Sequence, residues 1–241
     1  MCGTGGKNAL GIGEAGGILP TMGKRTLWGY VLPFLVFMLF LAGEGWFPDQ
    51  YYLIYPWKAL AVGALLLWYR RLYPSFRPSA PLLSVLVGIV GIVLWIGLDR
   101  YLVHYRGPVV GRNPFLLYPP AEAWVLFGFR LFGLALVVPV MEELFWRGFL
   151  MRGLIKEDFN SVPLGTYTPV SFFVTTALFA SVHGAEWPLA VVVGLLYGGW
   201  FLRTKHLGDV MLAHGTTNLI LGLYCLFSRD WHFISIASPK V

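Results

Sequence analysis

Charged residues are scarce in this sequence. Asp, Glu, Lys and Arg make up only 12% of its 241 residues, whereas 57% are hydrophobic, and a soluble domain carries about 25% charged residues. The scarcity therefore excludes an ordinary water-soluble domain. Apolar runs of roughly 17–25 residues, enough to cross a bilayer as a helix, recur along the chain. The alternating pattern of ~10-residue segments that is typical of a membrane β-barrel is missing.

Cysteine is almost absent as well. Cys2 and Cys225 are far apart, and the second lies in an apolar segment, so a disulfide framework or a zinc–cysteine site is not expected. The sequence has no HExxH, no GxSxG and no phosphate-binding loop, which disfavours zincin, serine-hydrolase and nucleotide-driven functions. The net charge of +6 comes from short loops at helix ends and predicts no nucleic-acid partner.

The apolar runs predict an all-α, polytopic membrane protein with about seven transmembrane helices. Proline-rich junctions separate several of these runs, as expected where helices stop. We expect a flexible N-terminal tail at 1–24, a helical membrane domain at 25–228 and a C-terminal tail at 229–241. The stretch 147–167 is amphipathic and predicts a short interfacial helix and loop. The expected spans are 26–43, 52–70, 82–104, 121–146, 168–183, 188–203 and 209–227.

Basic residues concentrate in alternate loops. The positive-inside rule then places the N-terminus in the cytoplasm, and Glu44 and Asp49 fall in a loop on the opposite side. The same topology puts Glu142 and His214 near one face and His183 toward the other. These side chains can meet only if the helix ending at His183 is tilted and the following turn dips into the bilayer, where irregular backbone is tolerated inside protein.

Two carboxylates and an arginine lie in the motif Glu142-Glu143-Leu-Phe-Trp-Arg147. Adjacent helix residues point about 100° apart, so the two glutamates cannot face one small site. Arg147 follows Glu143 by four residues, the spacing of same-face pairs. We therefore assign Glu143 to Arg147 and leave Glu142 as a general base. An interfacial ion pair would explain Arg147 alone, but carboxylates inside an apolar run are rare and by default functional.

Two further motifs place imidazoles on apolar helices. His183 follows Phe179 by four residues, so the Phe179 ring can line a site into which His183 points. His214 and Asn218 share one helix face, and both can donate hydrogen bonds to an oxyanion. Taken singly, His183 is equally well explained as an interfacial residue. The His214/Asn218 pair is equally well explained as an interhelical hydrogen bond.

Other features have structural explanations. The Gly194-x-x-x-Gly198 sequence predicts a close-packed helix face. Trp and Tyr near helix ends fit aromatic belts. Asp99, Arg100, Glu122 and Arg130 are interpreted as loop or interhelical pairs.

Together the three motifs resemble those of the CPBP family, the CAAX-protease and bacteriocin-processing intramembrane peptidases, whose type member is the type II CAAX prenyl endopeptidase. Its EExxxR, FxxxH and HxxxN motifs all occur here, in order, within about residues 121–227. The wider sequence around the first and third motifs is similar to the bacterial branch found with exosortase and PEP-CTERM sorting systems. The resemblance implies a multi-pass protein of the bacterial inner membrane that cleaves a membrane-associated protein or peptide.

The resemblance also implies roles for the motif residues. Glu142 and His183 would activate the attacking water, and His214 and Asn218 would stabilise the tetrahedral oxyanion. Glu143 and Arg147 would hold the first glutamate's helix in place. No cofactor is favoured. The alternative is a divalent metal such as zinc held by Glu142, His183 and His214, a known type of catalytic ligand set. The metal-free form is favoured because an asparagine beside His214 suits an oxyanion better than a metal.

Two other functions stay open at this point. A proton-coupled transporter could use Glu142 and the histidines as a relay, although the sequence shows no internal repeat. A non-catalytic membrane scaffold or sorting partner is the second alternative. Both gain weight if Glu142, His183, His214 and Asn218 do not converge on one cavity.

Overall fold

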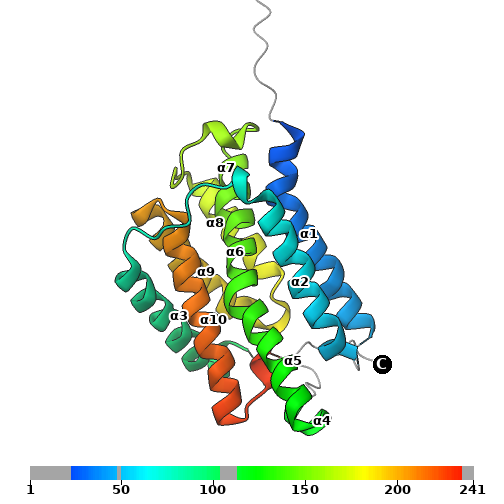
Figure 1. Cartoon of the computed structure of the whole chain (residues 1–241). Helices are drawn as coiled ribbons and strands as arrows, with labels where there is room; N and C mark the ends of the chain where they lie inside the picture. Colours follow the sequence, from blue (N-terminus) through cyan, green and yellow to red (C-terminus); the bar gives the residue numbers. More distant parts are fainter. Residues whose placement is uncertain (1–22, 48–49, 104–112, 235–241) are drawn as a thin grey trace, which may run out of the picture.

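The computed structural model describes residues 23–47, 50–103 and 113–234. Within these ranges the chain forms one bundle of helices, shown in Figure 1. The expected N-terminal tail lies outside the described residues apart from residues 23 and 24, and Lys24 already begins a helix. The helices are α1 (Lys24–Trp46), α2 (Tyr51–Tyr69), α3 (Pro81–Leu102), α4 (Pro114–Leu117), α5 (Pro120–Phe132), α6 (Val138–Glu143), α7 (Met151–Gly153), α8 (Pro169–Ser181), α9 (Trp187–Thr204) and α10 (Leu207–Ser228).

All seven expected segments are helical, which confirms the all-α class. Five helices among the described residues are long and apolar enough to cross a membrane: Lys24–Trp46, Pro81–Leu102, Pro120–Gly153, Gly184–Thr204 and Leu207–Ser228. Of the other two segments, Tyr51–Tyr69 has 19 residues and Pro169–Ser181 has 13. The bundle also exposes many large apolar side chains along its helices, and such a surface suits hydrocarbon rather than water. The protein is a multi-pass helical membrane protein.

The helix of the fourth expected span, 121–146, is longer than predicted. It does not end at 146 but runs from Pro120 to Gly153, 34 residues in all, because two π-helical segments interrupt the α-helix without breaking it. These are Gly133–Val137 and Leu144–Leu150. Residues 147–153 of the expected interfacial stretch therefore continue the long helix and do not form a separate helix. Beyond Gly153 this stretch holds only a short 3-10 turn, Phe159–Ser161.

Helix α3 packs against α10 at close range. A Cβ atom on Gly88 would lie 2.4 Å from the carbonyl oxygen of Ala213, so only glycine allows this approach. Asp209, at the start of α10, accepts hydrogen bonds from the backbone N–H groups of Ser79 and Ala80 and from the hydroxyl of Ser84. Those bonds satisfy N–H groups that lack helical partners at the start of α3, and they fix the two helices in register.

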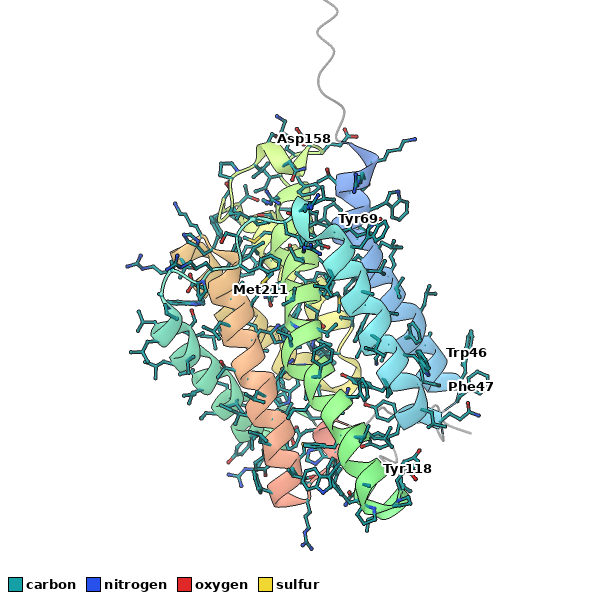
Figure 2. The ribbon with its side chains drawn as sticks, viewed as in Figure 1. Trp46, Phe47, Tyr69, Tyr118, Asp158 and Met211 are labelled. Carbon is teal, nitrogen blue, oxygen red and sulfur yellow. The ribbon has the colours of Figure 1, made fainter. Side chains whose placement is uncertain are left out.

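The two ends of the bundle differ. Figure 2 shows Asp158 and Tyr69 toward one end, and Trp46, Phe47 and Tyr118 toward the other. The first end also holds the beginning of α1 (Figure 1), which starts with Lys24 and Arg25. The expected C-terminal tail is described only as far as Ile234. Residues His232–Ile234 form a 3-10 turn, and Trp231 before it is buried among residues of α3, α5 and α10.

Candidate active site

The four residues assigned to catalysis converge on one cavity. Glu142, His183, His214 and Asn218 all line a space of about 160 Å³ inside the bundle. They come from the long helix, from the turn after α8, and from α10. His183 was expected near the opposite membrane face, but α8 is only 13 residues long, about 20 Å at the rise of an α-helix. The turn that follows it therefore brings His183 beside Glu142.

The two adjacent glutamates have different surroundings. Glu143 is fully buried, and its carboxylate contacts both Arg147 Nη1 at 3.0 Å and His214 Nδ1 at 2.9 Å. Glu142 faces the cavity, and its buried Oε2 has no hydrogen-bond partner among the described residues. Burial of an unpaired carboxylate oxygen is costly unless water or a ligand completes it. The division expected from helix geometry is present in the side-chain contacts: Glu143 is engaged in the protein and Glu142 is available to a ligand.

Arg147 links the long helix to α8 and α9. Its Nη2 donates to the carbonyl of Gly194 in α9 at 3.3 Å, and its guanidinium lies 4.9 Å from the ring centre of Phe179 in α8. Phe179 in turn lies 4.5 Å from the His183 ring, centre to centre. Arg147 therefore fixes Glu143 relative to α8 and α9. Phe179 lines the cavity as expected.

A backbone contact fixes the orientation of His183. Its Nδ1 lies 2.7 Å from the carbonyl oxygen of Phe179. A carbonyl only accepts hydrogen bonds, so Nδ1 carries a proton. When the ring is neutral, Nε2 is therefore a hydrogen-bond acceptor. His183 can then receive a hydrogen bond from a water molecule held beside Glu142.

His214 is held on three sides. Glu143 contacts its Nδ1, Tyr197 stacks on its ring at 5.1 Å with 27° between the planes, and Phe179 approaches edge-on at 6.4 Å. Tyr197 is itself fixed, because its hydroxyl donates to Thr217 Oγ1 at 2.7 Å. The Thr217 hydroxyl then donates to a carbonyl of α3, also at 2.7 Å. The ring of His214 consequently has one orientation relative to the cavity.

Asn218 is oriented by the first π-helical segment of the long helix, Gly133–Val137. Its Nδ2 donates to the carbonyl oxygen of Leu134 at 2.9 Å, and Leu134 lies in the first π-helical segment. Pro139, one turn later, has no N–H to offer the preceding carbonyls. The backbone at Leu134 and Ala135 thus faces α10, where a Cβ on Gly215 would lie 2.8 Å from the Ala135 oxygen. π-Helical turns of this kind are frequent at functional sites.

Tyr197 and Thr217 were not found from the sequence. The sequence analysis did not single out Tyr197, which is fully buried in α9. Its position did carry a signal, because Tyr197 follows Gly194 by three residues and so lies near the close-packed face predicted for α9. That packing is confirmed: a Cβ on Gly194 would lie 3.1 Å from Phe179, and one on Gly198 would lie 2.7 Å from Phe172.

The ligands of the alternative metal centre, Glu142, His183 and His214, line the same cavity. The Nδ1 contacts of His183 and His214 are of the kind that orient metal-binding histidines. However, across the described ranges no three His, Cys, Asp or Glu side chains stand together as a ligand group. As placed, Glu142, His183 and His214 share a cavity without forming a three-ligand metal site.

Comparison with known proteins points to the same segment. Residues 124–220 match the model of the family described as Rce1-like, type II CAAX prenyl endopeptidase Rce1-like. All three motifs lie inside the match, and it confirms the resemblance to the CPBP family. No curated protein and no solved structure matches the chain. The narrower resemblance to the exosortase-associated branch stays a prediction.

Proposed function

We propose that this protein is an intramembrane endopeptidase that hydrolyses a peptide bond near a membrane-associated or C-terminal segment of a protein substrate. The observation that carries the proposal is the convergence of Glu142, His183, His214 and Asn218 on one enclosed cavity. Polar groups drawn from two helices and from the turn after α8 meet there in a largely apolar protein, which is the arrangement expected of a functional site in a membrane. The family match to a CAAX-type peptidase gives the reaction class.

In the proposed reaction, Glu142 takes a proton from a water molecule that attacks the substrate carbonyl. Its Oε2 is a buried carboxylate oxygen that has no hydrogen-bond partner among the described residues and faces the cavity. His183 orients the same water by accepting a hydrogen bond at Nε2, since its Nδ1–H group donates a hydrogen bond to the Phe179 carbonyl. Glu142 afterwards returns the proton to the leaving amine, so the carboxylate is regenerated at the end of the cycle.

The developing oxyanion is stabilised by Asn218 and His214. The amide of Asn218 has two N–H groups, and the bond to Leu134 uses only one of them. His214 donates through Nε2 only when both ring nitrogens carry protons, because Nδ1 already faces Glu143. The Glu143 carboxylate beside it stabilises this imidazolium, and Arg147 balances the remaining charge of Glu143. A donor aimed at an oxyanion contributes about 10²–10³ in rate.

The proposed setting is the bacterial inner membrane, with the N-terminus in the cytoplasm. The bundle end that carries the start of α1 also carries the 3-10 turn Arg70–Leu72, which follows Tyr69 (Figure 2). Basic residues at one end of the spans orient a membrane protein toward the cytoplasm. The substrate is a membrane-associated protein or peptide, which would enter the cavity from within the bilayer or its edge.

The proposal is tested by comparing cells that carry the wild-type protein with cells that carry Glu142→Gln. Quantitative proteomics of membrane and secreted peptides should show an uncleaved precursor accumulating with the variant. Glu122→Gln, an exposed glutamate on the same long helix, is the matched control and should process the precursor normally. If Glu142→Gln leaves every peptide unchanged at wild-type protein levels, the peptidase assignment is wrong, and a scaffold or a proton-coupled transporter becomes the better explanation.

A further inference from the structure

The cavity that holds the catalytic residues is small. Its volume is about 160 Å³, below the range of about 300–1,000 Å³ that is typical of sites for drug-sized ligands. A neighbouring cavity of about 200 Å³ also reaches Glu142 and His183, but among the described residues His214 and Asn218 line only the first. A peptide carbonyl that meets those two donors must therefore enter the small cavity, and part of its lining has to move.

One lining residue, Phe233, differs from the others in its origin. The other lining residues belong to α3, the long helix, α8, the turn after α8, α9 or α10. Phe233 belongs to the distal turn, which is the segment 231–234 that follows α10 and contains the 3-10 helix His232–Ile234. Its side chain lines the cavity and is only partly buried. The distal turn lies at the end of the bundle that carries α4, away from the start of α1 (Figure 1).

A larger depression lies on the other side of the distal turn. It measures about 770 Å³, and Trp231 and His232 are among its lining residues. The distal turn is thus a partition, with Trp231 and His232 facing the depression and Phe233 facing the catalytic cavity. Displacing this short segment would join the two spaces, whereas a path between two spans would require packed helices to separate.

Side-chain contacts hold the distal turn on the bundle. Trp231 is buried in a cluster with residues of α3, α5 and α10. His232 contacts the Asp230 carboxylate through Nδ1 and lies 3.6 Å from the Asp99 carboxylate of α3 through Nε2. The His232 side chain is 26% exposed, and an ion pair that is open to water contributes little to stability. The contacts of His232 can therefore open more easily than those of the buried indole.

The chain can pivot where α10 ends. Arg229 adopts the left-handed conformation, with φ 60°, and its side chain is exposed. This conformation is unfavourable for a residue that has a Cβ atom, and it turns the chain back toward the bundle. Hinges are commonly residues at the ends of elements that absorb a change in φ and ψ. Rotation at Arg229 would lift the distal turn and leave the spans in place.

We propose that the distal turn is a gate of the catalytic cavity, closed in this structure, through which a substrate peptide enters. The inference rests on the proposed function and adds a point of entry to it, at the bundle end opposite the start of α1. In the closed state the Phe233 ring fills one end of the cavity. Opening about Arg229 withdraws the ring, and the peptide takes its place.

Thiol alkylation tests access to the cavity without turnover. Val193 lines the cavity, whereas Ala190, one turn earlier in α9, is buried but is not among the described lining residues. Each is replaced by cysteine in full-length Cys2→Ser/Cys225→Ala protein in detergent, and the rate of reaction with N-ethylmaleimide is measured. Addition of Phe233→Ala should speed alkylation at Val193→Cys about tenfold or more, because access no longer requires local opening. The Ala190→Cys thiol should react equally slowly with and without Phe233→Ala.

Phe227→Ala is the matched control for Phe233→Ala. It removes the same ring from a side chain of α10 that is 80% exposed, and alkylation at Val193→Cys should keep its parent rate. Equal rates for Phe233→Ala, Phe227→Ala and the parent would overturn the proposal, because the reagent would then reach the cavity by another path. Faster alkylation at both Val193→Cys and Ala190→Cys would also overturn it, because a general loosening of the bundle would explain the access.

The native thiol of Cys225 reports the movement of the distal turn itself. Cys225 is fully buried and belongs to the same cluster as Trp231, so lifting the indole exposes it. In Cys2→Ser protein, His232→Gln should raise the alkylation rate of Cys225 about 3- to 10-fold through more frequent local opening. The temperature of thermal unfolding should stay unchanged, because the lost contacts are partly exposed. An unchanged alkylation rate would overturn the proposal that the distal turn moves when His232 is released.

Turnover separates the gate from the proposed function. The substrate is the precursor that accumulates in cells with Glu142→Gln, and Phe233→Ala should raise its kcat/KM about threefold or more, because the competent open state is more populated. Phe227→Ala should leave kcat/KM unchanged. A lower kcat/KM in Phe233→Ala despite faster alkylation would overturn the role of Phe233 as an obstacle to the substrate. If wild type and variants cleave nothing while alkylation follows the expected pattern, the gate stands and the peptidase assignment is wrong.

Discussion

The Nδ1 atom of His214 lies 2.9 Å from Oε1 of Glu143, 71 residues earlier in the chain. Because the same carboxylate also pairs with Arg147 at 3.0 Å, Glu143 has two tasks. It neutralises a buried arginine, and it fixes which nitrogen of His214 faces the cavity. In the proposed reaction Glu143 therefore acts through His214, in addition to holding the helix of Glu142.

Glu143→Gln and Glu142→Gln should differ in stability. Loss of the Glu143 charge leaves Arg147 buried without its counter-ion, which should lower the free energy of unfolding by about 3 kcal/mol or more. Glu142→Gln removes no protein contact of Oε2 and should leave unfolding unchanged while abolishing turnover. Thermal unfolding in detergent and peptide cleavage measure the two effects. The opposite pattern, with Glu142→Gln unstable and Glu143→Gln stable but inactive, would show that the two roles are exchanged.

Tyr197 should position His214 through its ring. Tyr197→Phe keeps the stacked ring and loses only the bond to Thr217, so turnover should change little, while the free energy of unfolding falls by about 1 kcal/mol. Tyr197→Leu removes the stack, and kcat should fall about 10- to 100-fold with little change in KM. Steady-state kinetics on the processed substrate measure both. Equal kcat values for the two variants would show that the ring does not orient His214.

The arrangement of the spans and the facing of the motifs could be predicted from the sequence. Apolar runs separated by prolines gave all seven helical segments, and four-residue spacings correctly paired Glu143 with Arg147. Helix formation and four-residue spacing depend on residues that are close in the sequence, so the sequence alone predicts them. The spacing also placed Phe179 beside His183, although not the backbone contact from the Phe179 carbonyl to the His183 ring.

Other parts of the site depend on contacts between distant segments. The partnership of Glu143 with His214 joins two helices, and neither motif alone specifies it. The long helix was expected to end at 146 because the stretch from Arg147 onward is amphipathic, but Arg147 is buried and pairs with Glu143. Glu44 was misplaced because a charge near the end of an apolar run looks the same in sequence whether it lies in a loop or is buried against Lys58.

Gly215 should be required for the approach of α10 to the first π-helical segment. In Gly215→Ala the new Cβ would lie 2.8 Å from the Ala135 carbonyl oxygen, a backbone atom that cannot turn away. The helices would have to separate, which should cost about 1–3 kcal/mol of stability and lower turnover, because His214 and Asn218 flank this residue. Gly199→Ala is the control, since nothing lies within 4 Å of its added Cβ. If both variants unfold at the same temperature as wild type, the close contact is not a constraint.

Activity should not depend on a bound metal. In the proposed reaction Glu142 accepts the proton of water directly, and Asn218 and His214 donate hydrogen bonds to the oxyanion, so no Lewis acid takes part. The contacts of His214 agree with this role, because its Nδ1 faces the Glu143 carboxylate and its ring lines the cavity. A zinc site would need three side chains within about 2.0–2.2 Å of one ion. The described residues would have to move to form one.

We therefore expect purified protein to contain no stoichiometric metal and to keep its activity after exhaustive chelation. Elemental analysis and cleavage assays before and after chelation measure both, and chelated Glu142→Gln gives the inactive baseline. One zinc ion per chain, with activity lost on its removal and restored on its return, would assign Glu142, His183 and His214 as ligands. Glu142 could not then also be the free base, and the role of water activation would pass to the metal while the reaction remained peptide hydrolysis.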